Sequence, residues 1–549
     1  MAAREHQLSP ETALDQKGRW LLAFSYFGQL YGAAVFLLHG VLIFNVYYGA
    51  SAVELGLIGT VMSFYNALNG LPIARLADAG WLNRFKCFPE KKCGRRGPWV
   101  ALGVPSLAIG TACCFIAPAK DSTSLMLWFL FVYFMISNGF TAAFQSTLGI
   151  LQETMYTVKA RATQTMLGVP FQLVAYVLAG LIVPAILFTS VPSGISTCCV
   201  QPLAKCITAE CPCYEGNETI VRLTSEYSEK CPRFVATELG RSAVCNISAE
   251  MASDRYFLVG VASFIICTTA LVAIEPAKAP MTKKTSEPLF FLASIRETWK
   301  SRSFRWLAFM NFFNALAGQM LTGFMAYFFI YVIGIDFVDV GGEIASVGAI
   351  GITVSMLVNP FWNRLLVQTI PRSNLPLHHP AKIGVICAIA DGVVGTVCTF
   401  LSVATSSVVP FTVYFVFEGF FRGSNDQVYH GMMGWIIDED EMATGLRREG
   451  MFYAMNGACQ HMSILVYYIF VGVLGGVGFD SSVCPQNQKT GIVEYIILCI
   501  LFSRVTRIIA AIGYYMFPIK GEALSKILVF KTATTTSNKD ELTEKVEME

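Results

Sequence analysis

The sequence predicts an all-α membrane protein of twelve transmembrane helices, arranged as two six-helix halves. Three observations predict it: the chain is unusually apolar, its apolar residues form long uncharged blocks, and its two halves repeat one another. Of the 549 residues, 54% are hydrophobic and only 14% are charged, whereas a soluble domain is about one quarter charged. The lack of charge indicates a chain that lies mostly in lipid.

The apolar blocks define the helices. Each has about twenty residues or more, enough to cross a hydrocarbon layer of about 30 Å at about 1.5 Å per helical residue. Hydrocarbon offers the backbone no hydrogen-bond partners, so each block is expected to be helical. The predicted spans are 20–48, 53–74, 98–118, 124–148, 163–190, 256–275, 305–334, 342–366, 382–405, 409–436, 450–478 and 491–517.

The basic residues predict the orientation. Lys17 and Arg19 precede the first span, and the connections after the second, fourth, sixth and tenth spans are rich in lysine and arginine. Because such residues are retained on the cytoplasmic side, both termini are expected in the cytoplasm. The polar segment Met1 to Lys17 is not expected to be a signal peptide.

The two halves share landmarks. Arg19-Trp20-Leu21-Leu22-Ala23-Phe24 opens the first span, and Arg305-Trp306-Leu307-Ala308-Phe309 opens the seventh. The second landmark is an acid followed by an arginine: Glu153 and Arg161 at the end of the fourth span, and Asp438 and Arg447 at the end of the tenth. Two agreeing landmarks favour a parallel duplication over chance. The predicted parts are a half at 1–280 with an extracytoplasmic loop at 190–255, a linker at 281–304, a half at 305–520, and a disordered cytoplasmic tail at 521–549.

Two cytoplasmic motifs link the chain to a family. The first is Arg75-Leu76-Ala77-Asp78 followed by Cys93-Gly94-Arg95-Arg96-Gly97-Pro98-Trp99. The second runs from Trp435-Ile436-Ile437-Asp438 to Gly445-Leu446-Arg447-Arg448-Glu449-Gly450. Over most of both halves the chain resembles the glycoside–pentoside–hexuronide cation symporters, which include melibiose permease and the animal lysophospholipid symporters. The resemblance implies a major facilitator fold with cargo bound between two rocking halves.

The same motifs predict a cytoplasmic latch. Arginine pairs bidentately with carboxylates, so Asp78 with Arg95 or Arg96, and Asp438 with Arg447, are interpreted as gating pairs. The alternative is a cluster that only sets topology, since exposed ion pairs are often worth less than about 1 kcal/mol.

The chain departs from the family at the coupling-ion positions. With Gly56-Leu57-Ile58-Gly59-Thr60 as the anchor, the acids of the sugar-transporting members fall on Asn69, Ile73, Gln145 and near Ala33. Sodium coupling therefore does not carry over, and a proton is favoured as the coupling ion. The Asn69 and Gln145 amides are predicted to bind a polar substrate or to bond each other across helices.

Charged residues inside the tenth span are the main site candidates. Glu418, Arg422, Asp426 and His430 follow one another at four-residue intervals and so share one helix face. Charges at this depth are expensive and by default functional. Glu418, Arg422 and Asp426 are predicted substrate or coupling residues, and the alternative is a self-neutralising structural triad.

Other polar residues follow the same logic. His461 occupies the position where the resemblance places an intramembrane lysine, and it is interpreted as a proton-coupling site or a switchable contact to an anionic group. Asn314 is a predicted substrate residue, with helix–helix hydrogen bonding as the alternative reading for Asn311, Asn314, Gln319 and Gln172. Asp391 and His39 are weaker candidates, Asp391 because its span is usually peripheral in this fold.

The loop after the fifth span carries seven cysteines and two glycosylation sequons, at Asn217 and Asn246. Outside the cytosol an odd cysteine needs a partner elsewhere, and Cys484 is the cysteine that the other outward connections offer. Cys484 is therefore predicted to form a disulfide with one of the seven. The related lysophospholipid symporters look similar in bridging these two connections.

The predicted function is secondary transport of a small polar solute such as a sugar, glycoside or amino acid. A lysophospholipid or another amphiphile is the alternative cargo. A membrane-embedded enzyme or receptor is disfavoured because no metal-ligand spacing, nucleophile elbow or phosphate loop occurs. We expect a monomer in the plasma membrane or an endomembrane, with the bilayer and the cargo as partners and with no cofactor, metal ion or nucleic acid.

Overall fold

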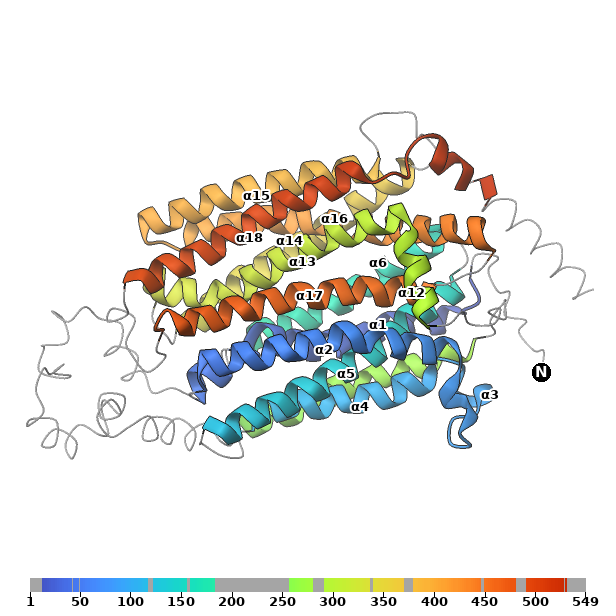
Figure 1. Ribbon diagram of the computed structural model, residues 1–549, viewed down its shortest axis with the longest axis horizontal. Helices are drawn as coiled ribbons and strands as arrows, with labels where there is room; N and C mark the ends of the chain where they lie inside the picture. The colour runs from blue at the N-terminus through green and yellow to red at the C-terminus, as the bar shows by residue number, and fades with distance from the viewer. Residues whose placement is uncertain are drawn as a thin grey trace, which may run out of the picture.

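The structure is a computed structural model that describes residues 12–116, 122–155, 158–182, 256–279, 291–335, 339–369, 379–445, 449–479 and 490–530, with single gaps at 42, 49 and 528. Long helices lie side by side along the longest axis of the molecule (Figure 1). The predicted all-α architecture is confirmed for these residues. Cys484, Asn217 and Asn246 lie outside them, so the disulfide and the glycosylation sites stay predictions.

The N-terminal half contributes six of the long helical segments. These are α1 (Gln16–Val35) continued by η1 (Phe36–Gly40), α2 (Ala52–Asp78), α4 (Gly97–Cys113), α5 (Ser122–Thr154), α6 (Val158–Val177) continued by η4 (Leu178–Ile182), and the segment Tyr256–Lys278. The helix α1 starts at a cap, where the Asp15 carboxylate accepts a hydrogen bond from the Gly18 amide at 2.7 Å.

The C-terminal half repeats the pattern. Its helices are α13 (Arg302–Tyr327) continued by η7 (Phe328–Ile333), α14 (Asp339–Thr369), α15 (Pro380–Thr405), α16 (Val409–Thr444), α17 (Glu449–Gly476) and α18 (Thr490–Met516). All twelve predicted spans are thus found as helices. Seven of these, within the described ranges, are long and apolar enough to cross a membrane by length and composition alone. Among the others, α4 has 17 residues, and α16 carries the charged stripe.

Some helices extend beyond their predicted ends. The helix α5 continues to Thr154 and α16 to Thr444, six and eight residues past the predicted ends at 148 and 436. Hydropathy marks only the part of a helix that lies in lipid, so a polar continuation escapes it. The helices α2, α5 and α16 finish at the same end of the bundle, where Arg95, Arg96 and α12 also lie. We name this end the basic end. The opposite end, where η4 stops at Ile182, is named the loop end.

Two short elements lie at the basic end. The helix α12 (Phe291–Lys300) falls in the predicted linker and runs across the ends of the long helices (Figure 1). The chain after α18 was predicted to be disordered from residue 521, and for the described residues this is wrong. Residues 522–527 are helical, because Leu524 and Ile527, three residues apart, are both buried against the core.

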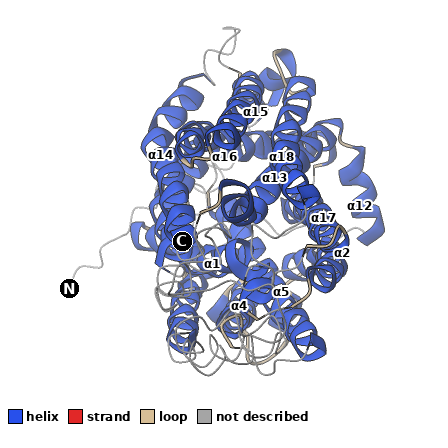
Figure 2. Ribbon diagram, turned by 90° about the vertical axis from the view of Figure 1, so that its left-hand side faces the viewer, coloured by secondary structure: helices blue, strands red, loops and turns tan. Residues whose placement is uncertain are grey.

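The two halves form two groups of helices that meet where α2 packs against α17 (Figure 2). Near the loop end this contact depends on glycine. A Cβ atom at Gly59 would lie 2.0 Å from the Tyr468 ring, and one at Gly56 would lie 2.5 Å from the Gly472 backbone. A side chain at Gly56 would therefore meet the backbone of α17, and one at Gly59 would have to displace the Tyr468 ring.

Candidate functional site

The N-terminal half presents a group of amide side chains, Asn66, Asn69, Asn138 and Gln145, which we name the amide cluster. Asn69 Nδ2 donates to Asn138 Oδ1, which also accepts a hydrogen bond from Tyr65 Oη at 3.2 Å. Asn66 is 1% exposed. Gln145 lies beside α2, because a Cβ at Gly70 would approach its Nε2 to 2.9 Å. The predicted residue Gln145 therefore lies beside the stretch of α2 that carries Asn69, and Asn69 forms a hydrogen bond with Asn138.

His461 lies opposite the amide cluster on α17. The contacts of Gly56 with Gly472 and of Gly59 with Tyr468 show that α2 and α17 run antiparallel. Continuing this register toward the basic end brings His461 level with Ala67 and its neighbours. The His461 Nδ1 atom is buried and has no hydrogen-bond partner among the described residues. Amides of one half and an imidazole of the other therefore lie at the same depth, at the interface between the halves.

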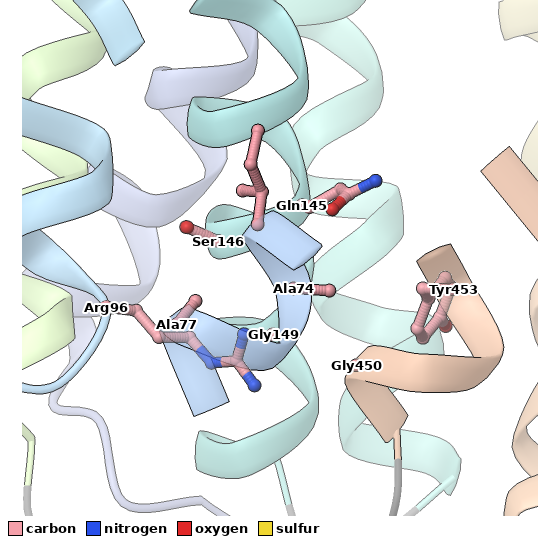
Figure 3. Close-up of a pocket in the computed structure, with 9 residues that line it drawn as sticks. Ala74, Ala77, Arg96, Gln145, Ser146, Gly149, Gly450 and Tyr453 are labelled. Carbon is pink, nitrogen blue, oxygen red and sulfur yellow. The ribbon is translucent and has the colours of Figure 1, made fainter. Parts of the chain in front are cut away.

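A small cavity opens between the halves toward the basic end (Figure 3). Its lining comes from both halves: Ile73, Ala74, Ala77, Arg96, Gln145, Ser146, Gly149, Gly450 and Tyr453. Buried Gln145 Oε1 and Ser146 Oγ have no hydrogen-bond partner within the described part of the chain. Two of the positions where the resemblance places acids, Ile73 and Gln145, thus line this cavity, and they bring no negative charge to it.

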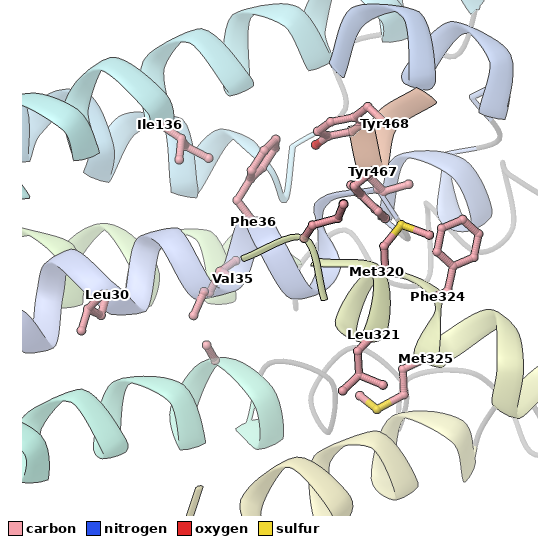
Figure 4. Packing of buried hydrophobic residues seen from close by; sticks show 14 of the residues in the cluster. Leu30, Val35, Phe36, Ile136, Met320, Leu321, Phe324, Met325, Tyr467 and Tyr468 are labelled. Atoms are coloured by element: carbon pink, nitrogen blue, oxygen red, sulfur yellow. The ribbon is translucent and has the colours of Figure 1, made fainter. Parts of the chain in front are cut away.

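Toward the loop end the interface is closed by aromatic rings (Figure 4). Phe36 and Tyr133 of the N-terminal half lie 4.9 Å apart by ring centroid, and Tyr133 lies 5.7 Å from Tyr468 of α17. The row continues through Tyr467 to Phe324 of α13 at spacings of 5.1 and 5.9 Å. A continuous aromatic layer therefore joins the halves at this end, whereas the cavity lies on the other side of the amide cluster.

The C-terminal half holds a charged cluster of Asp391, Glu418, Arg422, Arg504 and Arg507. Glu418 on α16 is 5% exposed, and Arg422 Nη1 lies 3.8 Å from its Oε1. The Arg422 side chain is 43% exposed, and its guanidinium carbon lies 5.8 Å from the ring centroid of Tyr176 on α6. Arg422 therefore reaches across the interface to the N-terminal half. The side chains of Asp426 and His430, the other members of the stripe, lie outside the described residues.

An ion pair joins the two peripheral helices of this half. Arg507 Nε on α18 lies 2.7 Å from Asp391 Oδ2 on α15, and both side chains are largely buried. Arg507 Nη1 donates to Asn314 Oδ1 at 3.1 Å, and Asn314 Nδ2 donates to the Tyr514 hydroxyl at 3.2 Å. The predicted residue Asn314 of α13 is thus held by an arginine of α18.

Sequence reasoning missed Arg504 and Arg507. Arg504 is 3% exposed, and its guanidinium carbon lies 3.9 Å from the Tyr414 ring centroid, a close cation–π contact. Both arginines lie well inside the predicted span 491–517. The rule that ionisable groups at membrane depth are functional by default would have found them. Arg507 is also the buried ion-pair partner of Asp391, which is a weaker candidate in the sequence because its span is usually peripheral in this fold.

At the basic end the arginine motif contacts Glu153, an acid that is not part of the predicted latch pairs. Arg96 Nε and Nη2 each lie 2.9 Å from Glu153 Oε1, and Arg95 Nη2 contacts the same oxygen. Glu153 ends the fourth span and was noted only as a landmark of the repeat. The side chains of Asp78 and Arg447 lie outside the described residues, so the two predicted latch pairs remain predictions. Asp438 is 1% exposed.

Two comparisons place this architecture among known proteins. The structure resembles that of a bacterial homologue of the human lysosomal transporter Spinster, with a TM-score of 0.53 at 16% identity, over 94% of this chain and 99% of that one. It also resembles the outward conformation of FucP, the Escherichia coli fucose:proton symporter, with a TM-score of 0.51 at 12% identity, over 92% of this chain and 99% of that one. Comparison with curated protein sequences finds no match.

The fold is therefore the twelve-helix major facilitator fold, and the protein is a multi-pass membrane transporter of the secondary, alternating-access class rather than an enzyme. Residues 45–521 match the model of the family described as MFS/sugar transport protein. The chain belongs to this family, and the resemblance to melibiose permease-like symporters is confirmed. The described residues include no group of three or more metal-ligating side chains.

Proposed function

We propose that the protein carries a small polar solute across a membrane and that a proton drives the transport. The observation that carries this proposal is the meeting of polar groups from both halves at one depth. The amide cluster of the N-terminal half and His461 of α17 lie at the same depth, and Arg422 reaches Tyr176 across the interface. Polar groups are expensive at this depth unless they serve a bound solute or each other. The family's description as sugar transporters supports the same class of cargo.

The two ends of the interface differ, and this difference supports alternating access. We infer that this structure is closed at the loop end. The aromatic row and the glycine contacts of α2 with α17 join the halves there. At the basic end the contacts of Arg95 and Arg96 with Glu153 lie within the N-terminal half. We propose that Asp78 with Arg95 or Arg96, and Asp438 with Arg447, act as latch pairs at the basic end.

The proton is proposed as the coupling ion because the cation positions of the family carry Asn69, Ile73 and Gln145, which bring no charge. Glu418 and His461 are the two groups that can exchange a proton within the described interface. The charge distribution supports a cytoplasmic basic end with both termini inside. We further propose a monomer, in the plasma membrane or an endomembrane, divided at the linker 281–304.

Uptake into proteoliposomes tests the coupling. At fixed pH and membrane potential, replacing potassium by sodium should leave the rate unchanged. Between about pH 5.5 and 7.5 the rate should vary. Steep dependence on sodium would contradict proton coupling while leaving the protein a transporter.

The cargo is tested by thermal unfolding of the purified protein, because a ligand that binds the native state raises its apparent stability. Sugars, amino acids and lysophospholipids form the screen. The lysophospholipid alternative is motivated by the cysteine-rich loop and Cys484, which resemble the lysophospholipid symporters in the sequence. Stabilisation by lysophospholipids alone would replace the polar solute by that cargo.

A further inference from the structure

Glu418 is a buried carboxylate surrounded by arginines. Arg504 and Arg507 of α18 and Asp391 of α15 act on it electrostatically, in addition to Arg422 of its own helix. The helix α14 approaches with Gly351, where an added Cβ would lie 3.5 Å from Glu418 Oε2. Within this group Asp391 and Arg507 neutralise one another through their 2.7 Å contact.

Arg504 lies inside the C-terminal half. It is almost fully buried between α15, α16 and α18, where a Cβ at Gly395 would lie 2.8 Å from its Cδ atom. Its Nε and Nη2 atoms have no hydrogen-bond partner among the described residues. The five residues of the charged cluster thus carry two negative and three positive formal charges when Glu418 is ionised.

Arg422 is the member of the charged cluster that faces the interface. Its side chain is 43% exposed, whereas that of Glu418 is 6% exposed, and their 3.8 Å contact is longer than a hydrogen bond. Its guanidinium lies over the Tyr176 ring on the opposite half. A guanidinium in this position matches the planar oxygen pairs of a carboxylate or a phosphate. Asp426 lies one turn further along α16, and its side chain is outside the described residues.

We propose that the cargo carries a negatively charged group that binds Arg422, and that Glu418 takes up the coupled proton. This proposal rests on the proposed proton-driven transport of a small solute, and it adds that the solute is negatively charged. When an anion binds Arg422, the Glu418 carboxylate loses its partner on α16 and accepts one proton from the water on the open side. One negative charge and one proton enter together, so the net charge of the cluster is unchanged and transport is electroneutral.

Matched pairs of probes test the charge of the cargo. Glucose is compared with glucuronate and glucose 6-phosphate, and monooleoylglycerol with lysophosphatidate, by thermal unfolding of the purified full-length protein at constant ionic strength. The anionic member of a pair should raise the apparent melting temperature, and Arg422→Gln should remove that rise. Arg364→Gln, at an exposed arginine of α14, is the control and should keep it.

Proton uptake tests the role of Glu418. Adding the anionic probe to weakly buffered protein should take up about one proton per anion, and affinity should rise by up to about tenfold per pH unit on acidification, as linkage requires. Glu418→Gln should bind the same probe without proton uptake and with little pH dependence. His461→Gln should retain both properties.

The outcomes separate the two proposals. Stabilisation by glucose alone, or an anion response that persists in Arg422→Gln, overturns the anionic cargo and leaves a small-solute transporter. A response to lysophosphatidate alone supports the anionic group but overturns the small solute as its source. No response to any probe counts against both, and proton uptake that persists in Glu418→Gln overturns the role of that carboxylate.

Discussion

The two halves present different polar groups beside their interface: the amide cluster in the N-terminal half and the charged cluster in the C-terminal half. The amide cluster of Asn66, Asn69, Asn138 and Gln145 has no formal charge, and its hydrogen bonds join neighbouring helices of one half. The charged cluster joins α13, α15, α16 and α18 through Arg507 and Arg504. Because the charged cluster contains a carboxylate that can take up a proton and the amide cluster does not, we expect the response to pH to lie in the C-terminal half.

The largest expected effect is at Asp391. Asp391→Asn leaves the buried Arg507 guanidinium without its counter-ion, and removing one partner of a buried pair destabilises by about 3–5 kcal/mol. The counterpart Asn69→Ala should cost only about 1 kcal/mol, because an intramembrane hydrogen bond between amides is worth little more. Thermal unfolding and yield in membranes measure both.

The double variant Asp391→Asn with Arg507→Gln is the matched control, since it removes both charges and should recover much of the lost stability. Equal destabilisation by Asp391→Asn and Asn69→Ala would remove the distinction between the two halves.

The next effect concerns transport rather than folding. Glu418→Gln and Arg422→Ala should each lower uptake by at least about tenfold while expression and delivery to the membrane persist, because each removes a group that acts in the transport cycle. Uptake per molecule of surface protein is the measurement. Near wild-type uptake by either variant would refute the site, and loss of the protein from the membrane would favour a purely structural role for the stripe.

A third experiment tells whether Glu418 of the charged cluster or His461 opposite the amide cluster takes up the proton. Glu418→Gln should abolish the pH dependence of uptake, whereas His461→Gln should preserve it and mainly weaken cargo binding. The reason is that His461 Nδ1 has no hydrogen-bond partner in the described interface and belongs to no ion pair there, so its protonation would leave a buried charge unbalanced. A flat pH profile in His461→Gln would move the coupling site to the amide side.

The architecture could be predicted from the sequence because lipid imposes one strong rule on the backbone. All twelve spans were predicted, and errors of six to eight residues arose at Thr154 and Thr444, where helices leave the lipid. The candidate site was only partly predictable. The stripe on α16 follows from helical periodicity, but the contact of Asp391 with Arg507 joins residues 116 positions apart. No local pattern specifies such a contact.

The latch shows the same limit. Arg95 and Arg96 were identified from their motif, yet the partner that both contact is Glu153, at the end of α5. A motif gives the residues that gather at one end of the bundle. The contact with Glu153 depends on how α4 packs against α5, where Gly149 allows the Arg96 guanidinium to lie against the helix.

The smallest expected effect is a pH dependence of stability at His379, which caps α15 outside the membrane-spanning segment. Its Nδ1 accepts from the Ala381 amide at 3.2 Å, and its Nε2 lies 2.9 Å from the Ile519 carbonyl oxygen. Burial, assisted by Lys520 and Lys382, lowers the pKa of His379 below its ordinary 6.5.

The unfolded chain therefore binds a proton that the folded protein resists, so stability should fall as pH drops below about 6.5 and level off above it. His379→Asn keeps a capping side chain but cannot titrate, and thermal unfolding between about pH 5 and 7.5 should show a shallower fall at acidic pH. An unchanged slope in this variant would mean that His379 does not contribute.

The absence of a side chain at Gly59 has a practical consequence. Its Cβ position is occupied by the Tyr468 ring, so even a methyl group there would have to displace this ring. A larger residue would favour a conformation whose cargo site is open toward the loop end and which cannot complete the transport cycle. A transporter held in this one conformation would suit equilibrium titration of its ligands and the raising of antibodies against a single conformation.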